Sequence, residues 1–109
     1  MKIYIAGKIT GNDRKETVLK FEAAAKKLIE SGHEVFIPCV LPDYPDVSHN
    51  DYLHICFAII DIVDAVYMLE DWQESIGARR ELQHAFDIQK AILYENEATR
   101  EKNFPRLNN

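Results

Sequence analysis

The chain alternates short, almost continuously apolar runs with longer segments in which apolar residues recur at helical spacing. Apolar runs of this length, rich in β-branched and aromatic residues, predict buried strands. They cover residues 2–6, 33–37, 63–69 and 90–94. An apolar stripe at every third or fourth residue predicts amphipathic helices. These helices run from about 13 to 31, from about 48 to 62 and from about 76 to 89.

Capping and turn residues separate these elements. Gly32 follows the first helical segment and is a typical helix-ending residue. Ser48, with Asp51 three residues later, indicates the capped start of the second helix. The segment 38–47 between them holds three prolines and is expected to be an irregular loop.

Strands that alternate with helices predict an α/β fold with a parallel sheet, helices on both faces and right-handed crossovers. We expect a three-layer Rossmann- or flavodoxin-like sandwich of four strands in the order 2-1-3-4. In such a sheet ligands bind outside the carboxyl ends of the strands, where the chain reverses direction between strands 1 and 3. The segments that reach this crevice are 7–12, 38–47 and 70–77.

The length of 109 residues fits one domain. We expect this domain to span residues 1–95 and a polar tail to follow over 96–109. Phe104 and Leu107 are apolar residues of that tail, and they either dock on the domain or a partner chain, or belong to a frayed end. A chain of this size buries only about two-thirds of its unfolded surface, so oligomerisation would add stability.

Charge and composition argue against several partner classes. The net charge is −5, with only 13 lysines and arginines, whereas a nucleic-acid-binding protein usually carries a basic excess. The longest apolar stretch is interrupted by Asp61 and cannot span a membrane. With no signal-peptide pattern, we expect a cytoplasmic protein whose Cys39 and Cys56 are reduced and buried. The four histidines share no ligand spacing, so we predict neither a metal site nor a cofactor.

The first loop carries two glycines and two hydrogen-bond donors. Gly7 and Gly11 would let the backbone turn tightly and direct its amides at an anion. Lys8 and Thr10 would add donors. The string matches neither the Walker A pattern nor GxGxxG, so a phosphate-binding loop and a plain strand-to-helix turn stay equal alternatives. In the proline-rich loop, Asp43 is a further candidate ligand contact.

The start of the third helix is a stronger candidate for anion binding, because a helix N-terminus presents unpaired amides and a partial positive charge. Ser75 either caps this helix or contacts a ligand. Gly77 is a poor residue for a first helical turn, and close approach of a ligand to the backbone would explain it. Trp72 precedes the helix, where it would stack on a flat ligand ring or pack on a neighbouring subunit.

Glu81 lies one turn into the third helix, and its side chain tilts back toward the helix N-terminus and the crevice. A carboxylate there can act as a nucleophile or base. The residue pattern by itself favours the alternative, a surface glutamate paired with Arg79, Arg80 or Lys90. Tyr4 lies in the middle of the first strand, and its hydroxyl needs a partner if it is buried; Glu81 could supply one, or Tyr4 is a plain core aromatic.

Three segments together resemble the nucleoside 2-deoxyribosyltransferase superfamily. They are Ile-Tyr-Ile-Ala-Gly-Lys-Ile-Thr-Gly over 3–11, Asp-Ala-Val-Tyr over 64–67, and Ser75-x-Gly77-x-x-x-Glu81. The stretch 71–78 is similar to one in a short bacterial and phage branch of that superfamily, and the resemblance extends to about Glu95. It implies cleavage or transfer of the N-glycosidic bond of 2′-deoxynucleosides or their 5′-monophosphates.

The resemblance also implies roles for individual residues. Glu81 matches the nucleophile that attacks C1′ of deoxyribose, and Tyr4 matches a tyrosine near it in the monophosphate-cleaving relatives. Ser75 stands where nucleoside-specific transferases carry an acid that holds the 5′-hydroxyl. A hydroxyl at this place removes repulsion toward a phosphate, so a 5′-nucleotide is the expected substrate.

Cys56 departs from the family pattern. The superfamily usually carries an aspartate eight residues before the aspartate of the third strand, here Asp64, and that place is Cys56. Asp71 is a better candidate for the missing carboxylate than Asp61, which should lie on a different face. We therefore expect either an enzyme that uses Glu81 or a catalytically weak module that senses or sequesters a nucleotide. A purely structural protein of the same fold is a third reading.

The expected partners are a small nucleotide or nucleoside and further copies of the chain. Trp72, Phe104 and Leu107 have no obvious place within one subunit, which favours a homo-oligomer. In the superfamily, neighbouring subunits often complete the site.

Overall fold

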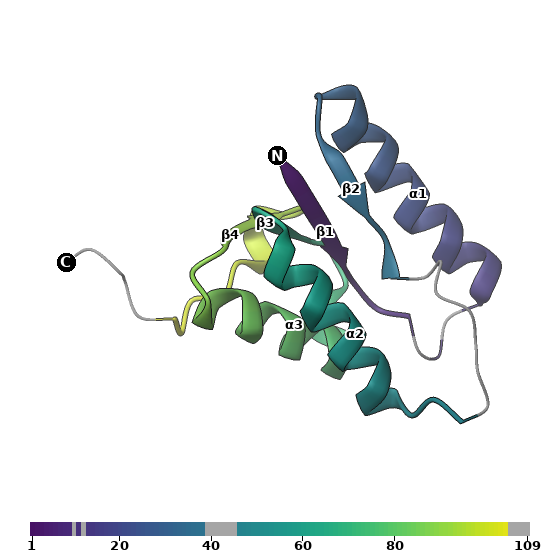
Figure 1. Cartoon of the computed structure of the whole chain (residues 1–109). Helices are drawn as coiled ribbons and strands as arrows, with labels where there is room; N and C mark the ends of the chain where they lie inside the picture. The colour runs from purple at the N-terminus through teal and green to yellow at the C-terminus, as the bar shows by residue number, and fades with distance from the viewer. Residues whose placement is uncertain (10, 12, 39–45, 105–109) are drawn as a thin grey trace.

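A computed structural model describes residues 1–9, 11, 13–38 and 46–104. Its strands are β1 (Lys2–Ala6), β2 (Glu34–Phe36), β3 (Ala65–Met68) and β4 (Ala91–Tyr94). The helices are α1 (Arg14–Glu30), α2 (His49–Ile62) and α3 (Ile76–Asp87), with short 3-10 helices at Trp72–Glu74 and Glu97–Thr99 (Figure 1). The predictions for Thr10, Cys39, Asp43 and Leu107 lie outside the described residues.

The four strands form one parallel sheet in the order β2-β1-β3-β4, which confirms the predicted fold. β1 is a central strand, and its residue Tyr4 lies opposite Phe36 of β2 and Val66 of β3. The order of the strands changes sides here, because β2 lies on one side of β1 and β3 lies on the other. The carboxyl ends of these two strands therefore define the crevice in which such folds bind ligands.

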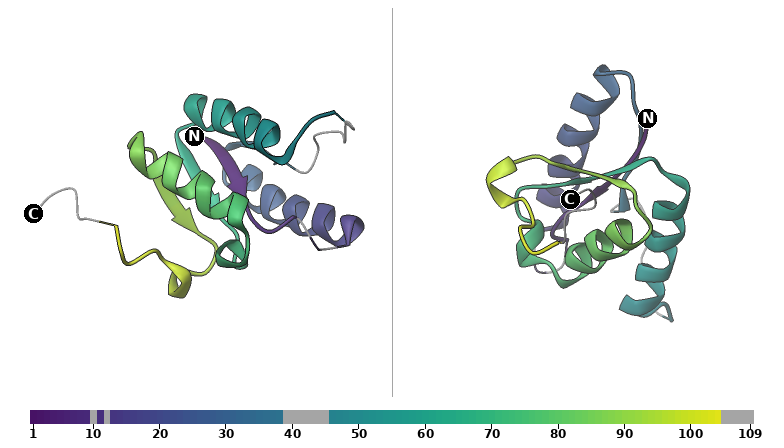
Figure 2. Two further views of the ribbon diagram at one scale, coloured as in Figure 1. Left: turned by 90° about the horizontal axis from the view of Figure 1, so that it is seen from below. Right: turned by 90° about the vertical axis from the view of Figure 1, so that its left-hand side faces the viewer.

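Helices cover both faces of the sheet, so the sheet is the middle of three layers (Figures 1 and 2). On one face, Phe21 of α1 packs against Ile3 and Ile5 of β1. On the other face, α2 and α3 cover Tyr4 together with alternate residues of β3 such as Val66. Because successive side chains of a strand point to opposite faces, Tyr4 lies on the α2 and α3 side.

The capping predictions are confirmed, while some element ends differ by one or two residues. Ser48 and Asp51 form a reciprocal capping box at the start of α2. Gly32 has a φ of 94° directly after α1, a left-handed conformation that glycine adopts without strain. α3 ends at Asp87, because Gln89 takes a φ of 64° and turns the chain into β4.

Trp72 corrects one prediction, because the structure buries it instead of leaving it beside the crevice. Its side chain is 3% exposed, and its indole Nε1 donates a hydrogen bond to Thr99 Oγ1 at 3.0 Å. The ring lies tilted against Tyr94, with 6.2 Å between the centroids. The 3-10 helix turns Trp72 back onto the domain, and the segment after β4 covers it.

The segment after β4 also packs on its own domain. The Phe104 ring stacks on Phe86 of α3 with 3.9 Å between the centroids. The backbone amide of Glu101 donates to the hydroxyl of Tyr94 at 3.2 Å. Trp72 and Phe104 therefore have places within one chain and no longer argue for a partner subunit.

Candidate functional site

Glu81 is a buried acid, 6% exposed. The interpretation as a surface glutamate paired with a neighbouring basic residue is therefore wrong. Its Oε2 accepts a hydrogen bond from the hydroxyl of Tyr4, which is completely buried. The structure thus brings together the two residues that the sequence nominated from opposite ends of the domain.

The sequence places Glu81 on the inner face of α3. The buried residues of this helix are Ala78, Glu81, Leu82 and Ala85, which recur at the spacing of one helical face. An ionisable residue inside such an apolar stripe has to find a polar partner, because burial of an unpaired carboxylate costs several kcal/mol. Tyr4 supplies it from β1.

Cys56 is the third polar group of this cluster, and the sequence pattern marked it only as a departure from the family. It lies on α2 and is 6% exposed. Its side chain belongs to the same buried core cluster as Tyr4, and the charge of Glu81 helps to raise the pKa of its thiol. The eight-residue spacing before Asp64 identified this position as a departure from the family pattern, but it did not show that the thiol is buried in one cluster with Tyr4.

Burial sets the protonation of the cluster. It raises the pKa of Glu81 to about 7, while the hydrogen bonds from Tyr4 and Cys56 lower it. Burial and then the charge of Glu81 raise the pKa of Tyr4 well above its usual value, so Tyr4 stays a neutral donor. Burial thus moves the ionisation of Glu81 toward neutral pH, a shift that is common among the titratable groups of functional sites.

The N-terminus of α3 has a side-chain cap, Ser75, and a glycine, Gly77, in its first turn. Ser75 accepts a hydrogen bond from the amide of Ala78 at 3.0 Å, so it caps the helix. A Cβ added to Gly77 would lie 3.8 Å from Nε2 of His49, an ordinary contact distance. Packing within the described chain therefore does not require glycine at position 77, and the ligand explanation stays open.

Close packing explains one glycine of the first loop. A Cβ at Gly7 would lie 2.7 Å from Cδ1 of Leu69, so only glycine fits there without a shift. Gly11 has a φ of 85°, which also favours glycine. The ammonium of Lys8 lies 3.7 Å from the carboxylate of Glu74, which brings this loop next to the approach to α3.

Asp71 ties the first loop to α1. Its carboxylate accepts hydrogen bonds from the backbone amide of Lys8 at 3.0 Å and from Nζ of Lys20 at 2.5 Å. Lys20 also donates to the carbonyl of Lys8 at 2.9 Å. These contacts are those of a clamp on the loop, and nothing in the sequence pattern had drawn attention to Lys20.

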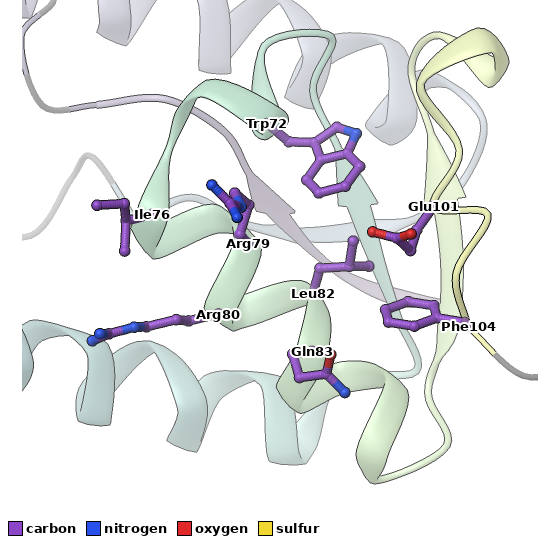
Figure 3. Close-up of a pocket in the computed structure, with 8 residues that line it drawn as sticks. All are labelled: Trp72, Ile76, Arg79, Arg80, Leu82, Gln83, Glu101 and Phe104. Carbon is purple, nitrogen blue, oxygen red and sulfur yellow. The ribbon is translucent and has the colours of Figure 1, made fainter.

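A separate cavity of about 530 Å³ lies between α3 and the segment after β4 (Figure 3). Arg80 points from this region toward α2, where its guanidinium lies 3.5 Å from Oδ1 of Asn50. Glu81 is not among the lining residues, so this cavity is distinct from the Tyr4–Glu81 pair. The cavity is lined by Trp72, Ile76, Arg79, Arg80, Leu82, Gln83, Glu101 and Phe104.

The fold and the cluster define a Rossmann-like α/β domain with a buried tyrosine–glutamate pair between the sheet and α3. The chain belongs to the family described as Domain of unknown function (DUF4406), which it matches over residues 1–94. No curated protein matches the sequence. Within the described ranges, no helix has the length and apolar character needed to cross a membrane, and no three metal-ligating side chains gather into a site.

Proposed function

We propose that the protein is a nucleoside 2-deoxyribosyltransferase-like enzyme that cleaves or transfers the N-glycosidic bond of a 2′-deoxynucleotide. The observation that carries the proposal is the buried carboxylate of Glu81, which accepts a hydrogen bond from Tyr4. A buried carboxylate that titrates near neutral pH is more typical of a reactive group than of a structural one.

In the proposed reaction, the ionised carboxylate of Glu81 attacks C1′ of the deoxyribose. The bond between C1′ and the base nitrogen breaks, and its electron pair leaves with the base, which takes up a proton from water. The resulting glycosyl ester is resolved by water or by a nitrogen of an acceptor base, which releases Glu81. The carboxylate also stabilises the positive charge that develops on the sugar.

The N-terminus of α3 supports a 5′-phosphate as the recognised group. Ser75 accepts a hydrogen bond from the amide of Ala78, and the other amides of the first helical turn together with the helix dipole favour an anion. The absence of a side chain at Gly77 leaves the backbone accessible. We accordingly propose a free cytoplasmic nucleotide, rather than a nucleic acid, as the substrate.

The test is release of free base from a panel of deoxynucleoside monophosphates and deoxynucleosides, measured by chromatography. We expect the monophosphates to be preferred and Glu81→Gln to reduce the rate by about a thousandfold or more. Glu74→Gln is the matched control, because Glu74 is exposed and precedes the same helix. Failure of every substrate, or an undiminished rate in Glu81→Gln, would contradict the proposal.

A nucleotide-binding module without turnover is the second candidate, and Cys56 is the observation that favours it. A thiol that burial keeps protonated cannot provide the charge of a second carboxylate beside Glu81. Titration calorimetry with the same monophosphates distinguishes the two functions. Binding without base release supports the module, whereas an absence of binding contradicts both candidates.

A further inference from the structure

Three polar groups from three different elements meet on the buried side of the sheet. Tyr4 comes from β1, Cys56 from α2 and Glu81 from α3, and each is 6% exposed or less. Tyr4 and Glu81 are joined by a hydrogen bond. Cys56 belongs to the same buried core cluster as Tyr4. The helix α2, which carries Cys56, packs directly against α3, which carries Glu81.

The thiol of Cys56 can serve Glu81 as a neutral donor. Burial, followed by the charge of Glu81, raises the pKa of this thiol to about 12, so it keeps its proton across the neutral range. Among the described residues, the titratable groups that act on Glu81 are Tyr4 and Cys56, and both lower its pKa through hydrogen bonds. Hydrogen bonds to the charged form of a carboxyl group favour that form.

We propose that Cys56 is a positioning residue, whose thiol proton acts with the hydroxyl proton of Tyr4 to hold the Glu81 carboxylate ionised and in one orientation. Two donors from two elements restrict a buried carboxylate more than one donor does. An acid at position 56 would do the opposite, because two buried carboxylates side by side cannot both ionise readily. Any effect of Cys56 on catalysis rests on the proposed function. Its effect on the ionisation and orientation of the Glu81 carboxylate does not.

The alternative is that Cys56 merely fills space between α2 and α3. Cysteine often behaves as a small hydrophobe in protein cores. The two roles predict different orders for the same set of variants. A donor is retained in Cys56→Ser and lost in both Cys56→Ala and Cys56→Val, while Val keeps more of the volume.

The test is an NMR titration of the Glu81 carboxyl carbon in the full chain, with Glu81→Gln to assign the resonance. We expect Cys56→Ser to leave the titration midpoint close to that of the unmodified chain. Cys56→Ala and Cys56→Val should raise the midpoint by about half to one pH unit, because a hydrogen bond to a charged group is lost. Cys56→Asp should raise it further.

Equal midpoints in the unmodified chain and in Cys56→Val would overturn the proposal, as would equal shifts in Cys56→Ser and Cys56→Val. The valine variant keeps the test available if the alanine variant fails to fold. The titration needs no substrate, so it separates this proposal from the proposed function. If Cys56→Val raises the midpoint but neither the unmodified chain nor any variant releases base, the role of Cys56 is supported and catalysis is contradicted. If the unmodified chain releases base but Cys56→Val leaves the midpoint unchanged, catalysis is supported and the role of Cys56 is contradicted.

Discussion

Burial of the Glu81 carboxyl group lowers the free energy of unfolding, and the size of this penalty depends on pH. The group has an unfolded pKa near 4.5 and a folded pKa of about 7. Below pH 4.5 both states hold the proton, and the group adds no pH dependence. Between 4.5 and 7 the unfolded state releases the proton first, so the free energy of unfolding falls as the pH rises. Above 7 the full penalty is present.

Glu81→Gln should therefore stabilise the protein at high pH, because the amide oxygen can still accept the Tyr4 hydrogen bond without a buried charge. The gain over the unmodified chain should grow between pH 5 and 8 to at most about 3 kcal/mol, which corresponds to the shift from 4.5 to about 7. Urea unfolding at several pH values measures it. Glu22→Gln on the exposed face of α1 is the control. A gain that does not change with pH would contradict the buried, titrating carboxylate.

At the residue scale the sequence predicted the contact between Tyr4 and Glu81 only as one of two alternatives. The residue pattern favoured a surface Glu81, because arginines flank it on the same helix, and strand periodicity indicated only the central place of Tyr4. The proximity of Cys56 depends on how α2 lies against α3, which local patterns do not determine. Trp72 was misplaced because its polar neighbours suggested exposure, whereas its burial depends on the distant Thr99 and Tyr94.

At the scale of elements, the two loops at the crevice are fixed by different means. Asp71 and Lys20 clamp the first loop, while Ser75 caps α3. The sequence predicted the position of both loops, because strand and helix periodicity bounds them. It could not predict the clamp, because a lysine on a helix surface carries no pattern that identifies the loop its side chain reaches.

Asp71→Asn and Lys20→Met test whether Asp71 acts as a clamp or contacts the substrate. The clamp predicts that both variants speed hydrogen exchange at the Lys8 amide and raise the KM for nucleotide to a similar extent. The loss in stability should stay below about 1 kcal/mol, since both side chains are partly exposed. A fall in kcat confined to Asp71→Asn would instead support the catalytic role predicted from the sequence.

Gly77→Ala tests whether a ligand approaches the backbone of α3. Alanine fits beside His49 and favours the helix, so the free energy of unfolding should stay unchanged or rise by up to about 1 kcal/mol. Nucleotide affinity, measured by calorimetry, should fall. Gly32→Ala is the contrasting control, because its φ of 94° makes it destabilising, while nucleotide binding by the folded protein should persist. Unchanged affinity in Gly77→Ala would remove this backbone from the site.

At the scale of the whole molecule, the fold followed from the sequence almost completely. Seven elements in strict alternation, each with its own periodicity, leave few arrangements for a parallel sheet. The path of the segment after β4 was left open, because its few apolar residues carry no periodicity. The structure places Phe104 of that segment on Phe86 of α3.

Association between copies stays a prediction, and the cavity beside α3 is where we expect it. Its rim carries Ile76, which is 66% exposed, together with arginines and Glu101, so two copies could pair opposite charges there. Light scattering across the micromolar range should show a dimer that Ile76→Asp dissociates. Ile29→Asp on α1, where Ile29 is 56% exposed, should not dissociate it. A monomeric unmodified chain would contradict the prediction.

The central claim is that Glu81 forms the bond to the sugar, and acid-quenched mass spectrometry of the protein during turnover tests it most directly. With a deoxynucleoside monophosphate that releases base, the account predicts a protein species heavier by one deoxyribosyl 5-phosphate. Peptide mapping should place the added mass on Glu81, and the species should be absent from Glu81→Gln. An adduct on another residue, or base release at full rate by Glu81→Gln, would contradict the account.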